Sequence, residues 1–317
     1  MNSRYVLRRV GAALFSLVFV LALNFVLFRM VKSDPVGSLF RGRNVSQAAK
    51  DRLRSEFGLD KSMPEQFLAY VEQTAQGNLG ISYATRQPVA DEISGKIWPT
   101  VLLVGSATIL SAILGVFAGI RAAWRRNSAF DRGSTGVSMF TYAIPDFYLG
   151  ILLLAFFAFW LAWLPTGGME TAGQGGVVDT VKHLILPCAA LAISYFGEYT
   201  IIMRSSLLEV LGEDYLITAR AKGLRDMLVR RRHAVPNAIL PVITLFALNL
   251  GFVLSGAIAV ETVFSWPGLG QATQDALKGP DYPMLQGLFL LFSAAIIFTN
   301  LVTDLVYGYL DPRVSTP

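Results

Sequence analysis

Residues 11–28 read GAALFSLVFVLALNFVLF, a stretch without a single charged side chain. An α-helix of about 20 apolar residues is long enough to cross the hydrocarbon core of a bilayer. Arg4, Arg8 and Arg9 precede the stretch, as in a signal peptide, but no small-x-small cleavage site follows it. We therefore predict a retained transmembrane helix.

The whole chain has a composition typical of membrane proteins. Of its 317 residues, 53% are hydrophobic and 15% are charged, which predicts an all-α integral membrane protein and not a soluble enzyme. The chain has a net charge of +5, but its basic residues do not form a run interleaved with aromatic residues. Nucleic acid is therefore not an expected partner. Six stretches are predicted to span the lipid bilayer within a single domain over residues 1–317: 10–30, 97–120, 136–164, 183–204, 238–261 and 285–309.

The distribution of lysine and arginine predicts the orientation of these spans. The loop after the second span carries four of them between residues 121 and 132, and the loop after the fourth carries seven between 204 and 232. The short loops 165–182 and 262–284 hold one each, Lys182 and Lys278. Because basic residues of short loops stay in the cytoplasm, both termini and segment 205–236 are expected there. Segment 31–96 is then extracytoplasmic.

Two parts of this outer segment have apolar residues at helical spacing. Residues 45–59 and 64–76 are predicted to form short amphipathic helices between glycine and proline punctuation. These helices either pack on the outer ends of the spans or form a docking surface for an external partner.

The cytoplasmic segment 205–236 contains EDYLITARAKGL at residues 213–224. Glu213 and Asp214 are acids of a predicted first helical turn, and Gly223 is placed to end that helix. Tyr215 and Ala219 lie on one face because residues four apart are neighbours. The helix is either solvated along the membrane surface or a lever that transmits force to a cytoplasmic partner.

Several chemistries lack the residues they require. No stretch fits the phosphate-binding pattern G-x-x-x-x-G-K-[ST], no G-x-S-x-G occurs, and GLGQAT at 268–273 lacks the third glycine of a dinucleotide site. Cys188 is the single cysteine and there are two histidines, which excludes a disulfide framework and disfavours a metal centre. We expect no cofactor on this chain, no metal site and no catalysis.

Polar residues within the predicted spans require an explanation because charge at membrane depth is costly. Glu198, flanked by Tyr195, either faces a water-filled pathway or pairs with an arginine or hydroxyl of a neighbouring helix. Asn249 and Ser255 either line that pathway or serve helix packing. Two further acids have structural expectations: Asp146, after Pro145, marks a helix break or cap, and Asp304 acts between helices.

One family accounts for many of these motifs together. DYLITARAKGL at 214–224, followed by RRRHAVPNAILPVITL at 230–245, resembles the EAA loop of permease subunits in binding-protein-dependent ATP-binding-cassette importers. VETVFSWPGLGQ at 260–271, DYPMLQG at 281–287 and NLVTDLVYGYLDPR at 300–313 are similar to the peptide/nickel branch of these permeases. Ile201 stands where many relatives carry arginine.

The resemblance implies a multi-pass permease of a bacterial or archaeal inner membrane. Its implied partners are a second homologous permease, as a heterodimer or homodimer, two ATPase subunits that carry ATP and Mg, and an extracytoplasmic substrate-binding protein. The implied cargo is di- or oligopeptides, with nickel, chelates or other small solutes as alternatives. A secondary transporter is the remaining class, and Glu198 is thin support for it.

The resemblance also assigns roles to residues. The helix in segment 205–236 is expected to couple to an ATPase, and the turn after the fifth span is expected either to anchor at the interface or to receive the binding protein. The coupling residues are Glu213, Asp214, Tyr215, Ala219, Arg220, Ala221, Lys222 and Gly223. The docking residues are Glu261, Trp266, Pro267 and Gly268.

Overall fold

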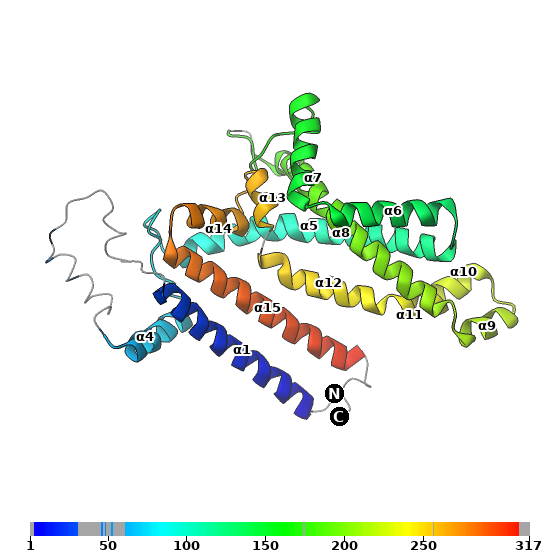
Figure 1. Ribbon diagram of the computed structural model, residues 1–317, viewed down its shortest axis with the longest axis horizontal. Coiled ribbons are helices and arrows are strands. Elements are labelled where there is room, and N and C mark those ends of the chain that lie inside the picture. Colours follow the sequence, from blue (N-terminus) through cyan, green and yellow to red (C-terminus); the bar gives the residue numbers. More distant parts are fainter. Residues whose placement is uncertain are drawn as a thin grey trace. The chain divides into compact units, whose positions relative to one another are not determined.

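The computed structural model describes residues 3–30, 46, 48, 52, 61–173, 175–255 and 257–310. These residues are mostly helical and include no β-strand (Figure 1). The predicted helix 45–59 lies outside them, apart from three single positions. The α-helices are α1 Ser3–Met30, α4 Met63–Ala75, α5 Val89–Trp124, α6 Ala129–Ala143, α7 Asp146–Leu153, α8 Val177–Val210, α9 Asp214–Ala221, α10 Asp226–Val229, α11 Val235–Ala238, α12 Leu240–Phe252, α13 Ile258–Val263, α14 Leu269–Lys278 and α15 Tyr282–Leu310.

The chain divides into two compact units. Unit 1 comprises Met1–Trp98 and Gln271–Pro317, and unit 2 comprises Pro99–Gly270. Each has its own packing and is described by itself. The single domain expected over the whole chain stays a prediction.

Four helices are long and apolar enough to cross a membrane: Tyr5–Phe28, Val89–Trp124, Val177–Val210 and Tyr282–Leu305. They correspond to the first, second, fourth and sixth predicted spans. Two further candidates are bent helix pairs, Ala129–Ala143 with Asp146–Trp160 and Asp226–Ala238 with Leu240–Phe252. The described residues therefore contain four to six candidate spans.

The third predicted span is broken where the chain reaches Pro145. The helix pair is bent by 100°, and the ring of a proline disfavours the helical region for the residue before it. Ile144 accordingly has extended φ and ψ of −89° and 129°. Asp146 begins α7, and its Oδ1 accepts a hydrogen bond from the Phe147 amide at 2.7 Å. The expectation of a break or cap at Asp146 is confirmed, and the predicted span 136–164 corresponds to this bent helix pair.

The fifth predicted span, 238–261, is wrong at its C-terminal end. Helix α12 stops at Phe252, a 3₁₀ turn follows over Val253–Ser255, and α13 begins at Ile258. Ala257 has φ −99° and ψ 72°, outside the helical region. The apolar sequence thus continues beyond Phe252, but helix α12 ends there.

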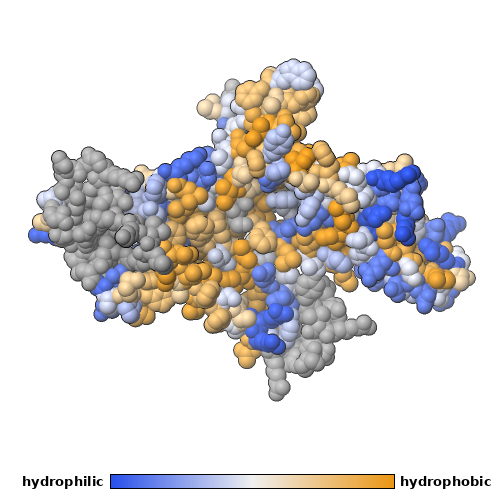
Figure 2. Space-filling model, in the orientation of Figure 1, coloured by the Kyte–Doolittle hydropathy of each residue, from blue (hydrophilic) through white to orange (hydrophobic). Residues whose placement is uncertain are grey.

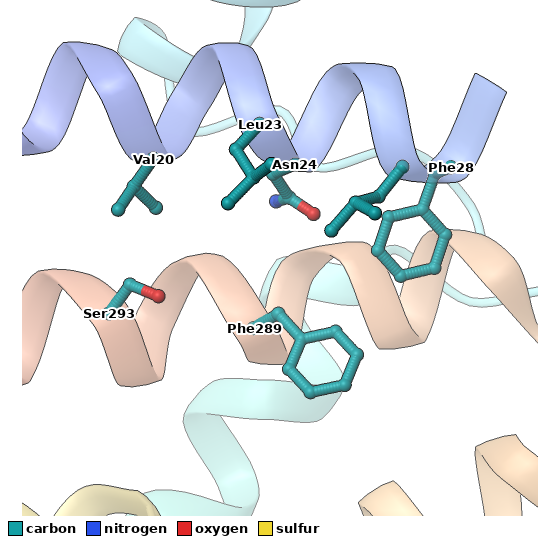
Figure 3. Close-up of a pocket in the computed structure, with 7 residues that line it drawn as sticks. Val20, Leu23, Asn24, Phe28, Phe289 and Ser293 are labelled. Atoms are coloured by element: carbon teal, nitrogen blue, oxygen red, sulfur yellow. The ribbon is translucent and has the colours of Figure 1, made fainter. Parts of the chain in front are cut away.

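Unit 1 is organised by the pairing of α1 with α15. Asn24 is buried in α1, and its Nδ2 donates to the Gln286 carbonyl at 3.0 Å and to the Tyr70 hydroxyl at 3.3 Å. A salt bridge of 3.0 Å joins Arg9 to Asp304, which confirms the expected role of Asp304 between helices. A groove of about 370 Å³ runs between α1 and α15 beside Asn24 and Phe289 (Figure 3).

The start of α15 holds the turn that precedes α5. Asp281 is 2% exposed, and its carboxylate accepts hydrogen bonds from the Ser82 hydroxyl at 2.5 Å and from the Tyr83 and Ala84 amides at 3.1 Å. It also accepts from the Met284 amide at 3.3 Å, as a helix cap does. One carboxylate therefore fixes both the helix start and the turn.

Helix α4 confirms the second predicted amphipathic helix. Ser62 donates to the Glu65 carboxylate from its amide at 3.0 Å and from its hydroxyl at 2.8 Å. These two hydrogen bonds lower the pKa of Glu65 because they favour its charged form.

The outer surfaces of the long helices are apolar. Leu7 and Phe15 of α1 are 74% and 73% exposed, and Phe117 of α5 is 69% exposed. Figure 2 shows hydrophobic side chains over α1 and α15 of unit 1. Such surfaces would be costly in water and fit contact with lipid.

Candidate functional site

Helices α5 and α8 form the frame of unit 2, and glycines bring them together. A methyl group added at Gly115 would lie 2.6 Å from Cβ of Tyr199, and one at Gly119 would lie 2.7 Å from Cβ of Met203. Only glycine permits this approach, as in small-xxx-small helix contacts of membrane proteins. The two helices are therefore in backbone-level contact over at least one turn.

An ion pair joins α6 to α8 at the end of the same frame. Arg204 Nε and Nη2 donate to the two carboxylate oxygens of Asp131 at 2.5 and 3.0 Å. Asp131 is 2% exposed and also accepts from the Asn127 amide at 2.8 Å. Sequence analysis used Arg204 only as an orientation marker and missed Asp131, because 73 residues separate the partners.

Helix α9 confirms the helix expected within segment 205–236. Glu213 is its N-cap residue and Asp214 lies in its first turn. At its end Gly223 has φ of +80°, the left-handed conformation that glycine adopts most easily. The Gly223 amide donates to the Arg220 carbonyl at 2.9 Å and the Leu224 amide to the Ala219 carbonyl at 3.4 Å, so the helix ends in a Schellman motif.

The inner face of α9 packs on its own chain. Leu216 and Ala219 are 0% and 7% exposed and belong to a core with Met203 and Leu207 of α8. Ala219 therefore faces the core of its own chain, whereas it was expected to face a partner. The outward face carries Ile217, which is 59% exposed, together with the exposed Asp214, Thr218, Ala221 and Lys222.

A polar contact fixes the first turn of α9. The Tyr215 hydroxyl accepts from Asn237 Nδ2 at 3.1 Å and donates to the His233 carbonyl at 3.4 Å. Asn237 Nδ2 also donates to the His233 carbonyl at 2.8 Å. In Figure 2 hydrophilic side chains gather on the part of unit 2 that α9 and α10 form.

Of the pathway candidates, Glu198 and Asn249 lie in one polar group between α8 and α12, whereas Tyr195 packs against the hydrophobic cores of unit 2. Asn249 Nδ2 donates to the Tyr199 hydroxyl at 3.1 Å, and its side chain also hydrogen-bonds Glu198. Glu198 and Tyr195 are half-buried. The partner of Glu198 is therefore an amide, whereas sequence analysis considered arginine or hydroxyl partners. Ser255 ends the 3₁₀ turn after α12.

The docking candidates form a mostly buried cluster at the end of α13 and in the turn that follows it. Glu261 and Trp266 are fully buried and Gly268 is buried, whereas Pro267 is half-buried. Trp266 Nε1 donates to the Pro99 carbonyl at 2.9 Å. The Thr100 hydroxyl donates to Glu261 at 2.9 Å and accepts from the Leu269 amide at 2.7 Å. A methyl group at Gly268 would lie 2.4 Å from Glu261 Oε2, so this glycine is required by packing.

Comparison with known proteins identifies the family. Residues 92–316 match the model for the binding-protein-dependent transport system inner membrane component, and residues 2–104 match the model for the N-terminal region of such membrane components. The chain belongs to this family of inner membrane components. Sequence relatives of this component cover nearly its full length. A putative peptide permease protein of Brucella suis biovar 1 is 38% identical, and the dipeptide transport system permease protein of Escherichia coli K12 is 37% identical, each with 98% of both chains aligned.

A further relative of this inner membrane component is the glutathione transport system permease protein of Escherichia coli O6:H1, 37% identical with 98% of both chains aligned. The family is one of membrane permeases and not of catalytic subunits. Among the described residues, no group of three or more histidine, cysteine, aspartate and glutamate side chains is arranged to hold a metal ion.

Proposed function

We propose that this chain is the permease subunit of an ATP-driven importer of di- or oligopeptides. The observation that carries the proposal is the near-complete alignment with relatives named for peptide, dipeptide and glutathione transport. Peptide backbones are common to all three named cargoes, which favours them over nickel and other small solutes of the same branch.

The proposed topology has six spans with both termini in the cytoplasm. It treats each bent helix pair as one span. It is supported by the four and seven basic residues of the loops 121–132 and 204–232, against one each in the loops on the other side. The whole chain then acts as one permease domain in the inner membrane, with segment 31–96 outside.

The proposed complex contains a second homologous permease, two ATPase subunits that bind ATP and Mg, and a substrate-binding protein. The membership in a binding-protein-dependent transport family supports the binding protein. ATP hydrolysis belongs to separate chains because no phosphate-binding loop occurs in this sequence. A heterodimer of permeases is the arrangement we favour.

Coupling is proposed to occur at the outward face of α9. Because Leu216 and Ala219 are fixed in the core of unit 2, a force on Ile217 and its exposed neighbours moves the helix with the spans that it packs on. Rigid helices of this kind transmit shear and hinge motions. Glu213, Gly223 and the Schellman motif define the ends of that helix, while Arg220 and Lys222 supply exposed positive charge at its C-terminal end.

Glu198, Tyr195, Asn249 and Ser255 are proposed to line the pathway, since a carboxylate at membrane depth is costly without a role. The cluster of Glu261, Trp266, Pro267 and Gly268 is proposed to order the loop that receives the binding protein. Its burial supports a role in shaping the loop more than direct contact by each residue.

Reconstitution of the complete complex tests the function. Proteoliposomes with the two permeases, the ATPases and the binding protein should take up labelled dipeptide only when ATP and Mg are on the ATPase side. Uptake that follows an ion gradient without any ATPase would instead establish a secondary transporter. Nickel uptake in place of dipeptide uptake would refute the cargo while leaving the importer class intact.

A further inference from the structure

Trp124 is the last residue of α5 and lies at the meeting point of three helical segments. It is half-buried and packs against the core that contains Leu216 and Ala219 of α9. The residue before it, Ala123, is itself 2% exposed in that core. The end of a long membrane helix is thus in the same cluster as the inner face of the coupling helix.

Two arginines lie over the Trp124 ring. The guanidinium carbon of Arg220, from the last turn of α9, is 6.0 Å from the ring centroid, and that of Arg230, from the π-helix Arg230–Ala234, is 5.7 Å away. A cation within about 6 Å of an indole face is attracted by the ring quadrupole, and tryptophan is the strongest partner of this kind. One ring therefore holds two segments that are ten positions apart in the sequence.

This contact complements the attachment at the other end of α9. Tyr215 in the first turn is bonded to Asn237 of α11, whereas Arg220 in the last turn contacts α5. The helix is consequently fixed at its start to the segment leading into α12 and at its end to α5. Displacement of α9 can therefore move both α5 and the segment that leads into α12.

We propose that Trp124 is the positioning residue that transfers movement of α9 to α5. The inference rests on the proposed coupling of α9 to an ATPase. From Trp124 the movement continues along α5 to Gly115 and Gly119, where the backbone of α5 meets α8. Interior helix packing of this density transmits displacement instead of absorbing it.

The ring also has a property that a simple apolar anchor lacks. The aromatic face attracts both guanidinium groups electrostatically, which an aliphatic side chain of similar volume does not do. Tryptophans near membrane surfaces also act as interface anchors, and that role predicts different behaviour on substitution.

The test uses the complete reconstituted importer and measures ATP hydrolysed per molecule of dipeptide transported. Trp124→Leu keeps apolar volume but removes the aromatic face, and Trp124→Phe retains a weaker one. The matched control is Phe130→Leu, which removes another arginine–aromatic pair at the same end of α5, Arg121 over Phe130 at 4.9 Å, without touching α9. An interface anchor alone would change the amount of inserted complex and leave this ratio unchanged.

We expect Trp124→Leu to raise the ratio by about threefold or more, since loss of two such contacts weakens the attachment by at least that factor. Trp124→Phe should lie between Trp124→Leu and the unmodified protein, and Phe130→Leu should match the unmodified protein. If Trp124→Leu does not assemble, Arg230→Gln removes one of the two contacts from its other side without altering α9, and it should give a smaller rise in the same direction; an unchanged ratio would overturn the role of Trp124.

A third variant, Ile217→Asp on the outward face of α9, tests the proposed coupling of α9 to an ATPase separately from the role of Trp124. If Ile217→Asp abolishes substrate-stimulated hydrolysis while the ratio in Trp124→Leu stays at the unmodified value, the role of Trp124 is overturned and coupling through α9 stands. If Ile217→Asp leaves transport and hydrolysis coupled, the proposed coupling helix fails and the inference about Trp124 fails with it.

Discussion

Replacement of Gly119 by alanine should separate α5 from α8. The added methyl group would lie 2.7 Å from both Cβ of Met203 and the carbonyl oxygen of Thr200. One of these atoms belongs to the backbone, so a rotamer change cannot relieve the overlap. The helices must move apart by several tenths of an ångström along the contact.

The magnitude follows from the cost of overpacking. Forcing an extra methyl group into a packed interior destabilises a protein by about 1–3 kcal/mol. Gly115→Ala should act in the same direction, because its methyl group would meet Cβ of Tyr199 at 2.6 Å. The double variant should cost less than the sum of the two, since helices separated by the first substitution already admit the second.

Gly105 offers a matched control on the same helix, because a methyl group there meets nothing within 4 Å. Gly105→Ala should be neutral or stabilising by up to about 1 kcal/mol, the helix-propensity gain of alanine over glycine. Unfolding of the chain purified in mild detergent, titrated with a denaturing detergent and followed by circular dichroism, measures all of these variants. Equal unfolding midpoints for Gly105→Ala and Gly119→Ala would refute the close contact of α5 with α8.

Two further predictions concern buried polar contacts. Thr100→Val removes a hydroxyl that both donates and accepts across the cluster after α13 and should cost about 1–3 kcal/mol in the same unfolding assay. Thr108→Val should cost less, because this equally buried hydroxyl donates to the Val104 carbonyl one turn away on the same helix. Asp131→Asn should cost about 1–3 kcal/mol, because Arg204 loses its charged partner while its own side chain, 25% exposed, keeps part of its hydration. In a double-mutant cycle with Arg204→Gln the combined loss should be clearly smaller than the sum, and additivity would contradict the pairing.

Local signals in the sequence predicted most of the long helices and some of their ends. Long apolar runs predicted four of the spans because length and hydropathy alone determine whether a helix can cross lipid. Gly223 was correctly placed at the end of α9, since the left-handed residue of a Schellman motif is most often glycine. Asp146 and Glu65, acids in the first turns of α7 and α4, likewise accept hydrogen bonds from amides one and three residues away.

Contacts between segments distant in the sequence could not be predicted. The pairing of Asp131 with Arg204 joins residues 73 positions apart, and nothing in the local pattern of either residue indicates the other. The burial of Ala219 was also not predicted. A short helix with few large apolar residues does not indicate which of its faces will pack against the core. Burial of Glu261 depends on Thr100, which lies 161 positions earlier.

The central claim is that the outward face of α9 contacts an ATPase subunit. Ile217→Cys introduces a thiol at an exposed position, in a chain whose native Cys188 is buried. In the assembled, transport-competent complex, a short thiol cross-linker should join Ile217→Cys to the ATPase. Trp98→Cys, at an exposed position expected on the opposite side of the membrane, should give no such product. Absence of an ATPase adduct at Ile217→Cys in complexes that still import dipeptide would contradict the account.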